Sequence, residues 1–121
     1  MRNIPQRCNN PTNLMLPKPI GECTGILRII ESEPIGYCEF PTPEAGWRAA
    51  HRQIVLDQVR NLTLKQFIFK FAPPGENDTN EYLDFVISEF HVPPDVPLSQ
   101  LSKYALGGVM AKMEGYYEEE R

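Results

Sequence analysis

The sequence lacks any long hydrophobic run, and this absence excludes two classes of protein. No apolar stretch approaches the roughly 20 residues that a helix needs to span a bilayer. No apolar run follows a basic patch near Met1, so we expect no signal peptide. The sequence therefore predicts a soluble chain without membrane insertion.

Cysteine, histidine and clustered basic residues are also scarce. Cys8, Cys23 and Cys38 are an odd number without paired spacing, which suits a reducing compartment. A zinc site needs close pairs of ligands, whereas His51 and His91 are distant from the cysteines, so we expect no metal ion and no cofactor. The 12 Lys and Arg are scattered among 16 Asp and Glu, and the net charge is −4. We therefore expect no nucleic-acid partner.

The 121 residues fit a single domain, residues 1–121, with enough apolar material for one modest core. We divide it into an irregular or β-stranded segment (1–41), a helical core (42–117) and an acidic tail (118–121). The acidic run is more typical of a solvated chain end than of a binding tail.

The first segment is rich in proline, and four prolines within residues 1–19 prevent a long helix there. Two short apolar runs follow, at residues 25–30 and 36–40, each bounded by turn residues. They predict a small β-hairpin that turns across residues 31–35.

Four helices are predicted in the remaining chain. Thr42, with a proline and an acid after it, predicts a helix from about 43 to Arg60. Thr63 begins a capping box and a short helix through Phe71, and Asp78 begins another that carries an apolar stripe as far as Phe90.

The last predicted helix spans about residues 99–117, with one apolar face. That face consists of Leu101, Ala105, Val109 and Met113. Gly107 and Gly108 inside it indicate either a kink or close backbone packing, and both remain open. The expected fold class is mainly α (α+β): about four helices with a short amino-terminal hairpin or irregular segment.

Amide side chains are concentrated in one loop, at Asn9, Asn10 and Asn13. Each amide offers both a donor and an acceptor, so these residues are candidates for binding a sugar's hydroxyl groups. The alternative is that they close turns around Pro11, and residue types alone favour this alternative.

A second loop, before the third predicted helix, places Glu76, Asn77 and Asp78 together and could hold a ligand. Helix capping explains Asn77 and Asp78 without a ligand, but it does not explain Glu76. At the corner before the first long helix, Glu44 better suits a first-turn acid than an acid–base catalyst. Trp47 there suits the core better than a sugar-stacking platform.

Glu114 lies near the end of an apolar-faced helix and is followed by Tyr116 and Tyr117. A carboxyl group held against apolar and aromatic groups loses solvation, which favours its protonated form. A general acid for glycoside cleavage is made in this way. A surface glutamate beside the acidic tail is the alternative, and spacing alone favours it.

Four segments, in this order, resemble a family of short bacteriophage and prophage proteins described as virion or structural proteins. The family pattern is an amide-rich "NNPGN" start, an "F.SPEAG..A" corner, a "WAPP.ENDT..Y" segment and a late glutamate and glycine. The matching residues are 9–13, 40–49, 71–82 and 114–115. The resemblance covers about residues 7–116, and FAPPGENDT with Tyr82 after it is its most specific part.

The resemblance implies a relation to lysozyme-like, peptidoglycan-processing domains. Glu114 would then protonate the glycosidic oxygen, and the two loops with Tyr82 would line the sugar site. Because no second carboxylate is identifiable, a lytic transglycosylase mechanism, in which the sugar's own hydroxyl attacks, suits better than a two-carboxylate hydrolase. The implied partners are other virion proteins, bacterial peptidoglycan, or both. The expected location is the virion, or the host cytoplasm before assembly.

Two departures from the family pattern bear on the site. Thr12 replaces a glycine, so the first loop adopts a positive φ there less readily. Phe71 replaces a tryptophan and removes an indole N–H. Two non-catalytic alternatives also remain: a structural virion component that presents an interface to neighbouring subunits, and a small phage protein that binds a host target.

Overall fold

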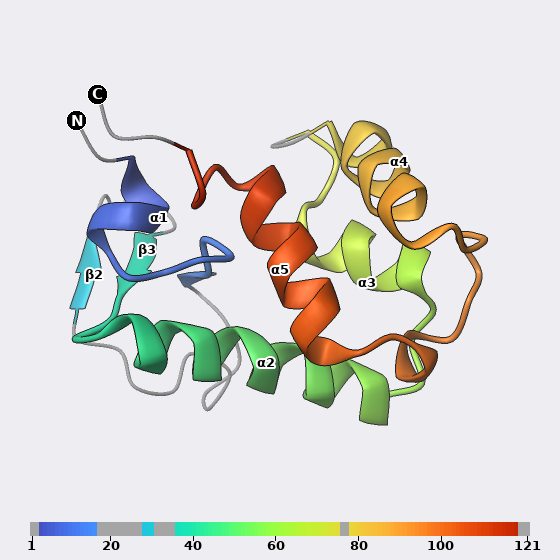
Figure 1. Cartoon of the computed structure of the whole chain (residues 1–121), viewed down its shortest axis with the longest axis horizontal. Coiled ribbons are helices and arrows are strands. Elements are labelled where there is room, and N and C mark those ends of the chain that lie inside the picture. Colours follow the sequence, from blue (N-terminus) through green and yellow to red (C-terminus); the bar gives the residue numbers. More distant parts are fainter. Residues whose placement is uncertain (1–2, 17–27, 31–35, 76–77, 119–121) are drawn as a thin grey trace.

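The protein is mainly helical, as the sequence predicts, with a small sheet at one end (Figure 1). The computed structural model describes residues 3–16, 28–30, 36–75 and 78–118. The elements are α1 (Ile4–Arg7), β1 (Met15–Leu16), β2 (Arg28–Ile30), β3 (Gly36–Glu39), α2 (Pro43–Val59), α3 (Leu64–Phe71), α4 (Thr79–Phe90), a 3₁₀ turn (Leu98–Gln100) and α5 (Lys103–Met113).

Three of the four predicted helix starts are confirmed. The side chains of Thr42, Thr63 and Asp78 each accept a hydrogen bond from the backbone N–H three residues later. Each bond satisfies one of the N–H groups that have no partner within the first helical turn. The four long helices of the prediction are therefore α2 to α5, and the four-residue α1 is an addition to it.

The predicted face of the last helix is right in part, and its predicted bounds are wrong. Leu101, Val109 and Met113 contact the main core as expected, but Ala105 is exposed. α5 begins after the Ser102 cap, and its most deeply buried side chains are Leu106 and Met110. Leu101 has an extended backbone at the end of the 3₁₀ turn. It is therefore not part of α5, and the i, i+4 spacing that places residues on one helical face does not apply to it. The helix ends at Met113 because Gly115 has a φ of +86°, which terminates helices.

The predicted hairpin pairing is confirmed, since β2 and β3 are antiparallel with Ile29 opposite Cys38. The predicted turn and the start of the first run lie outside the described residues. β1, a two-residue strand, pairs with the other edge of β3 to give the order β1-β3-β2. Such a short strand leaves no alternation in the sequence for a prediction to use.

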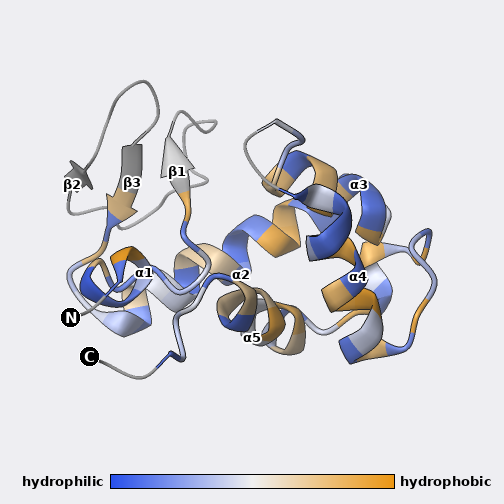
Figure 2. Ribbon diagram, turned by 90° about the horizontal axis from the view of Figure 1, so that it is seen from above, coloured by the Kyte–Doolittle hydropathy of each residue, from blue (hydrophilic) through white to orange (hydrophobic). Residues whose placement is uncertain are grey.

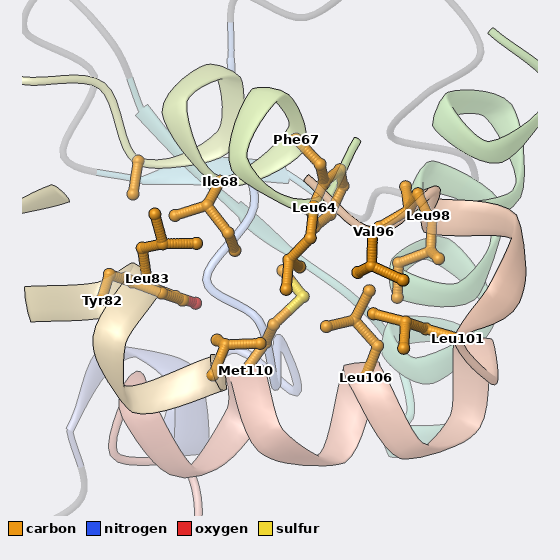
Figure 3. Close-up of a cluster of buried hydrophobic side chains, with 13 residues drawn as sticks. Leu64, Phe67, Ile68, Tyr82, Leu83, Val96, Leu98, Leu101, Leu106 and Met110 are labelled. Carbon is orange, nitrogen blue, oxygen red and sulfur yellow. The ribbon is translucent and has the colours of Figure 1, made fainter. Parts of the chain in front are cut away.

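Two clusters of buried apolar side chains form the core. The larger joins α3, α4 and α5 and the segment around Val96–Leu101 (Figure 3). The smaller lies where the sheet meets the start of α2 and contains Leu14, Cys38, Phe40, Ala45 and Ala49. Phe71 packs against both clusters, so it connects the two parts of the molecule. Figure 2 shows α2 and α5 between the sheet and the α3–α4 pair.

A buried charge also ties α2 to α3. The Asp57 carboxylate is fully buried and accepts hydrogen bonds from Lys70 Nζ (2.7 Å), Arg60 Nη1 (3.0 Å) and Gln53 Nε2 (2.9 Å). A buried carboxylate is tolerated only when it is paired and hydrogen-bonded in this way. Asp57 therefore supports the fold, and its oxygens are already engaged within the protein.

Glycines allow close approaches between segments at Gly46 and at Gly107. A Cβ atom at Gly46 would lie 1.7 Å from the backbone oxygen of Asn9, so α2 and the first loop touch without an intervening side chain. At Gly107 a Cβ would lie 3.3 Å from the His51 ring, whereas at Gly108 nothing lies within 4 Å. Close packing thus explains one glycine of the 107–108 pair.

We predict opposite effects for two glycine-to-alanine variants. Gly46→Ala should lower the free energy of unfolding by more than about 3 kcal/mol, or prevent folding, because neither backbone can move away cheaply. Gly108→Ala, the matched control, should raise it by about 0.5–1 kcal/mol through helix propensity. Urea unfolding followed by circular dichroism measures both values, and equal stabilities of the two variants would contradict the contact.

Candidate functional site

Glu114 lies at the carboxyl end of α5, where the helix gives way to a turn. It is the C-cap, and its backbone N–H donates to the carbonyls of Lys112 and Met110. The next residue, Gly115, has positive φ, so the chain changes direction immediately after the acid. The Glu114 side chain is half-buried.

The other end of the described chain holds this turn in place. Asn3 Nδ2 donates to the Gly115 carbonyl (2.8 Å), and Gln6 Nε2 donates to the Tyr116 carbonyl (3.1 Å). The same two side chains form the capping box of α1. Figure 1 accordingly shows α1 on the same side of the molecule as the turn that follows α5. The backbone around Glu114 is therefore fixed by residues more than a hundred positions earlier.

Tyr82, from α4, faces Glu114. Its ring is 4% exposed and meets Phe71 edge-on, with 6.3 Å between the ring centroids. Figure 3 shows it reaching from α4 into the main core. Burial, followed by the charge and proximity of Glu114, raises the pKa of Tyr82 well above its usual value. The hydroxyl group therefore remains protonated at neutral pH and can donate a hydrogen bond.

Asn13 approaches Glu114 from the first loop. Its φ of +58° lies in the left-handed region, which asparagine tolerates better than most residues. Its backbone N–H donates to the Asn10 carbonyl (3.0 Å), which closes the turn. The structure thus brings together three of the residues predicted for the site: Glu114, Tyr82 and Asn13.

Burial and two neighbouring side chains change the pKa of Glu114 in opposite directions. Burial raises the pKa of Glu114 from 4.5 to about 7, and the nearby Tyr82 hydroxyl and Asn13 amide lower it in part. Yet the Tyr82 hydroxyl and Asn13 Oδ1 are buried without a hydrogen bond of standard geometry among the described residues. Both groups therefore lie close to the Glu114 carboxyl without a hydrogen bond of standard geometry.

Asn9 and Asn10 support the fold. Asn10 is fully buried: its Oδ1 accepts from the Leu14 N–H (2.8 Å), and its Nδ2 donates to the carbonyls of Leu14 and Cys38. Asn9 Nδ2 donates to the Phe40 carbonyl. These bonds join the loop to β3 and to the corner before α2. The turn-closing alternative thus describes both residues better than sugar binding does.

The second predicted loop contributes little that the structure describes. Glu76 and Asn77 lie outside the described residues. Asp78 is exposed, and its carboxylate caps α4 by accepting from the Glu81 N–H (3.1 Å). Glu44 is an exposed acid in the first turn of α2, in agreement with its predicted place.

Sequence reasoning missed two features of the site. The capping pair Asn3 and Gln6 has the spacing of a helix start, and this signal was available in the sequence. Thr12 is buried, and its Oγ1 has no hydrogen-bond partner among the described residues. The left-handed positions of this loop are Asn9 and Asn13, so the expected difficulty at Thr12 does not arise.

A scan against protein-family models and a search of curated proteins find no match to this chain. In the described part of the chain, no group of three or more His, Cys, Asp or Glu could hold a metal ion. None of the helices built from those residues has the length and apolar character to cross a membrane.

The arrangement gives one carboxyl group the properties of a proton shuttle. With a pKa of about 7, Glu114 exists in comparable amounts as acid and as base at neutral pH. Tyr82 and Asn13 add a hydroxyl and an amide within reach of the same carboxyl. Such perturbed groups are common at active sites, where acidity is matched to the reaction.

The raised pKa predicts a pH-dependent stability. Since the folded-state pKa is above the unfolded value, the folded state holds the proton more tightly. Ionisation of Glu114 therefore lowers stability as the pH rises from about 4.5 through 7. Glu114→Gln mimics the protonated side chain and should raise the free energy of unfolding by about 1–2 kcal/mol at pH 8, discounted for partial exposure, and by little at pH 4.

Urea unfolding at pH 4, 6 and 8 measures this difference. Glu81→Gln makes the same chemical change at an exposed position and should leave the pH dependence unchanged. Identical pH dependence in the wild type and in Glu114→Gln would show that Glu114 has ordinary acidity.

Proposed function

We propose that this protein cleaves glycosidic bonds of bacterial peptidoglycan, with Glu114 as the general acid. The observation that carries the proposal is the Glu114 carboxyl group, whose pKa is raised to about 7 beside Tyr82 and Asn13. A carboxyl that has lost part of its solvation and is partly protonated at neutral pH can serve as the general acid of glycoside cleavage. Peptidoglycan as the substrate rests on the resemblance in residues 9–13, 40–49, 71–82 and 114–115.

The proposed reaction needs one acid. Protonated Glu114 donates its proton to the glycosidic oxygen as the bond between that oxygen and the anomeric carbon breaks. A hydroxyl group of the same sugar then attacks the anomeric carbon and returns its proton to the Glu114 carboxylate. Atoms and charge balance, and no water is consumed. Asp57, the buried carboxylate of α2, is held by Lys70 and Arg60 and does not supply a second catalytic acid.

Tyr82 and Asn13 have supporting roles in this proposal. The Tyr82 hydroxyl stabilises the Glu114 carboxylate left after proton donation, because its own pKa keeps it protonated. The Asn13 side chain lies beside the same carboxyl and favours its ionised form, so it supports the carboxylate together with Tyr82.

The same resemblance leads us to propose that the protein is encoded by a phage and associated with the virion. Its partners there would be other virion proteins, and its substrate the cell wall met during infection. Before assembly, the protein would be in the host cytoplasm.

The enzymatic part of the proposal predicts that the purified protein releases muropeptides from peptidoglycan sacculi. Glu114→Gln should reduce this release by at least about a hundredfold, since general acid catalysis contributes 10²–10⁴-fold. Glu81→Gln, the matched exposed control, should retain wild-type release. Wild-type activity in a folded Glu114→Gln variant would remove Glu114 from the mechanism.

The virion part of the proposal predicts a fixed stoichiometry in purified particles, measured by quantitative mass spectrometry. A lysis protein without a structural place would be absent from washed particles. Absence together with muropeptide release would leave the enzyme standing and remove the virion assignment.

A further inference from the structure

Five aromatic rings form a continuous row along the contact between α2 and the α5 end of the molecule. We call Tyr104, His51, Trp47, Tyr116 and Tyr117 the aromatic row. His51 meets Tyr104 edge-on with 4.8 Å between centroids and stacks on Trp47 at 5.7 Å. Trp47 then meets Tyr116 at 5.6 Å and Tyr117 at 6.4 Å.

Much of the aromatic row faces solvent. Tyr104 is 65% exposed and Tyr117 is 58% exposed. Trp47 and Tyr116 are half-buried, and Trp47 belongs to neither of the two core clusters. The predicted core role of Trp47 therefore does not describe its environment. Contiguous exposed apolar surface commonly marks a binding site.

The charges around the aromatic row restrict its occupant. Glu118 follows Tyr117 directly, whereas the positive charge of Lys112 acts on Tyr117, so neither sign of charge predominates at this end of the row. Lys103 Nζ lies 5.1 Å from the centroid of Tyr104, so a cation of the protein already occupies one ring face. Burial and Lys103 both lower the pKa of His51, which is thus neutral at pH 7. A neutral occupant with weakly positive C–H faces fits these conditions.

A pyranose ring has this character, because its axial C–H groups form a flat apolar face that packs on the partly negative face of an aromatic ring. We propose that the aromatic row binds the uncharged pyranose faces of a glycan chain, as an extended subsite for the polymer that Glu114 cuts. Tyr116 and Tyr117 belong to the turn that follows Glu114 and that Asn3 and Gln6 hold in place. The identity of the polymer rests on the proposed function, whereas the aromatic row itself can be tested alone.

Trp47 provides a direct probe, since it is the only tryptophan in the chain. The titrant is a hexamer of β-1,4-linked N-acetylglucosamine, and the protein is the uncleaving Glu114→Gln variant. We expect a saturable change in Trp47 emission. Single-stranded DNA and oligolysine, titrated in parallel, should produce none. A response to oligolysine or DNA with none to the sugar would overturn the proposal in favour of a charged partner.

Two exposed rings can be removed without opening the core. Tyr104→Ala combined with Tyr117→Ala should weaken binding of the hexamer about tenfold, because each ring contributes stacking energy. Val59→Ala is the control: Val59 is 74% exposed and lies outside the aromatic row. In the Glu114→Gln background, the double variant should also pellet less with peptidoglycan sacculi than the Val59→Ala control does.

The outcomes separate this inference from the proposed function. If the double variant binds the hexamer as the Val59→Ala control does, the aromatic row is not a glycan site, whatever Glu114 does. If binding depends on the aromatic row but Glu114→Gln still releases muropeptides, the subsite stands and the assignment of Glu114 fails.

Discussion

The contact between Gly46 and the Asn9 carbonyl determines where the first loop can lie, and the remaining structure depends on that position. Because no side chain separates them, α2 begins directly against this loop. Asn10 then fixes the rest of the loop through three hydrogen bonds to Leu14 and Cys38. Asn13 reaches Glu114 only from a loop held in this way. The close packing of the Gly46 and Asn9 backbones thereby helps to place Asn13 beside Glu114.

Glu114 and its neighbours Tyr82 and Asn13 come from three distant parts of the sequence. The burial that raises the pKa of Glu114 also lowers the stability of the fold. Burial beside Tyr82 destabilises the charged carboxylate, so the fold loses stability as Glu114 ionises. The same loss of solvation brings its pKa close to neutrality. The apolar core that joins α3, α4 and α5 stabilises the fold against this local loss.

Much of the fold could be predicted because local signals and tertiary structure agree. Thr42, Thr63 and Asp78 are strong caps, and all three begin helices where the sequence placed them. The last helix was misread because Leu101 extends the apolar pattern past the true helix start. β1 is too short to carry any periodicity. Secondary-structure propensity identifies a helix or strand, but it does not determine where that element ends and the next begins. Both errors are of this kind.

The site was only partly predictable, for a different reason. Glu114, Tyr82 and Asn13 were each singled out, but their proximity depends on chain packing that no motif encodes. Asn10 was a candidate because it is an amide in a loop. In the structure it is buried and its side chain is hydrogen-bonded to Leu14 and Cys38, so it supports the fold. Trp47 was expected in the core because tryptophan usually is. Its neighbours in the aromatic row come from α5 and the turn after it, far along the sequence.

The clamp formed by Asn3 and Gln6 has a consequence for biosynthesis. Their partners, the carbonyls of residues 115 and 116, leave the ribosome more than a hundred residues later. Until then Asn3 and Gln6 lack these partners, and the turn that carries Glu114 is not held by α1. The clamp can therefore close only after nearly all of the described residues have been synthesised.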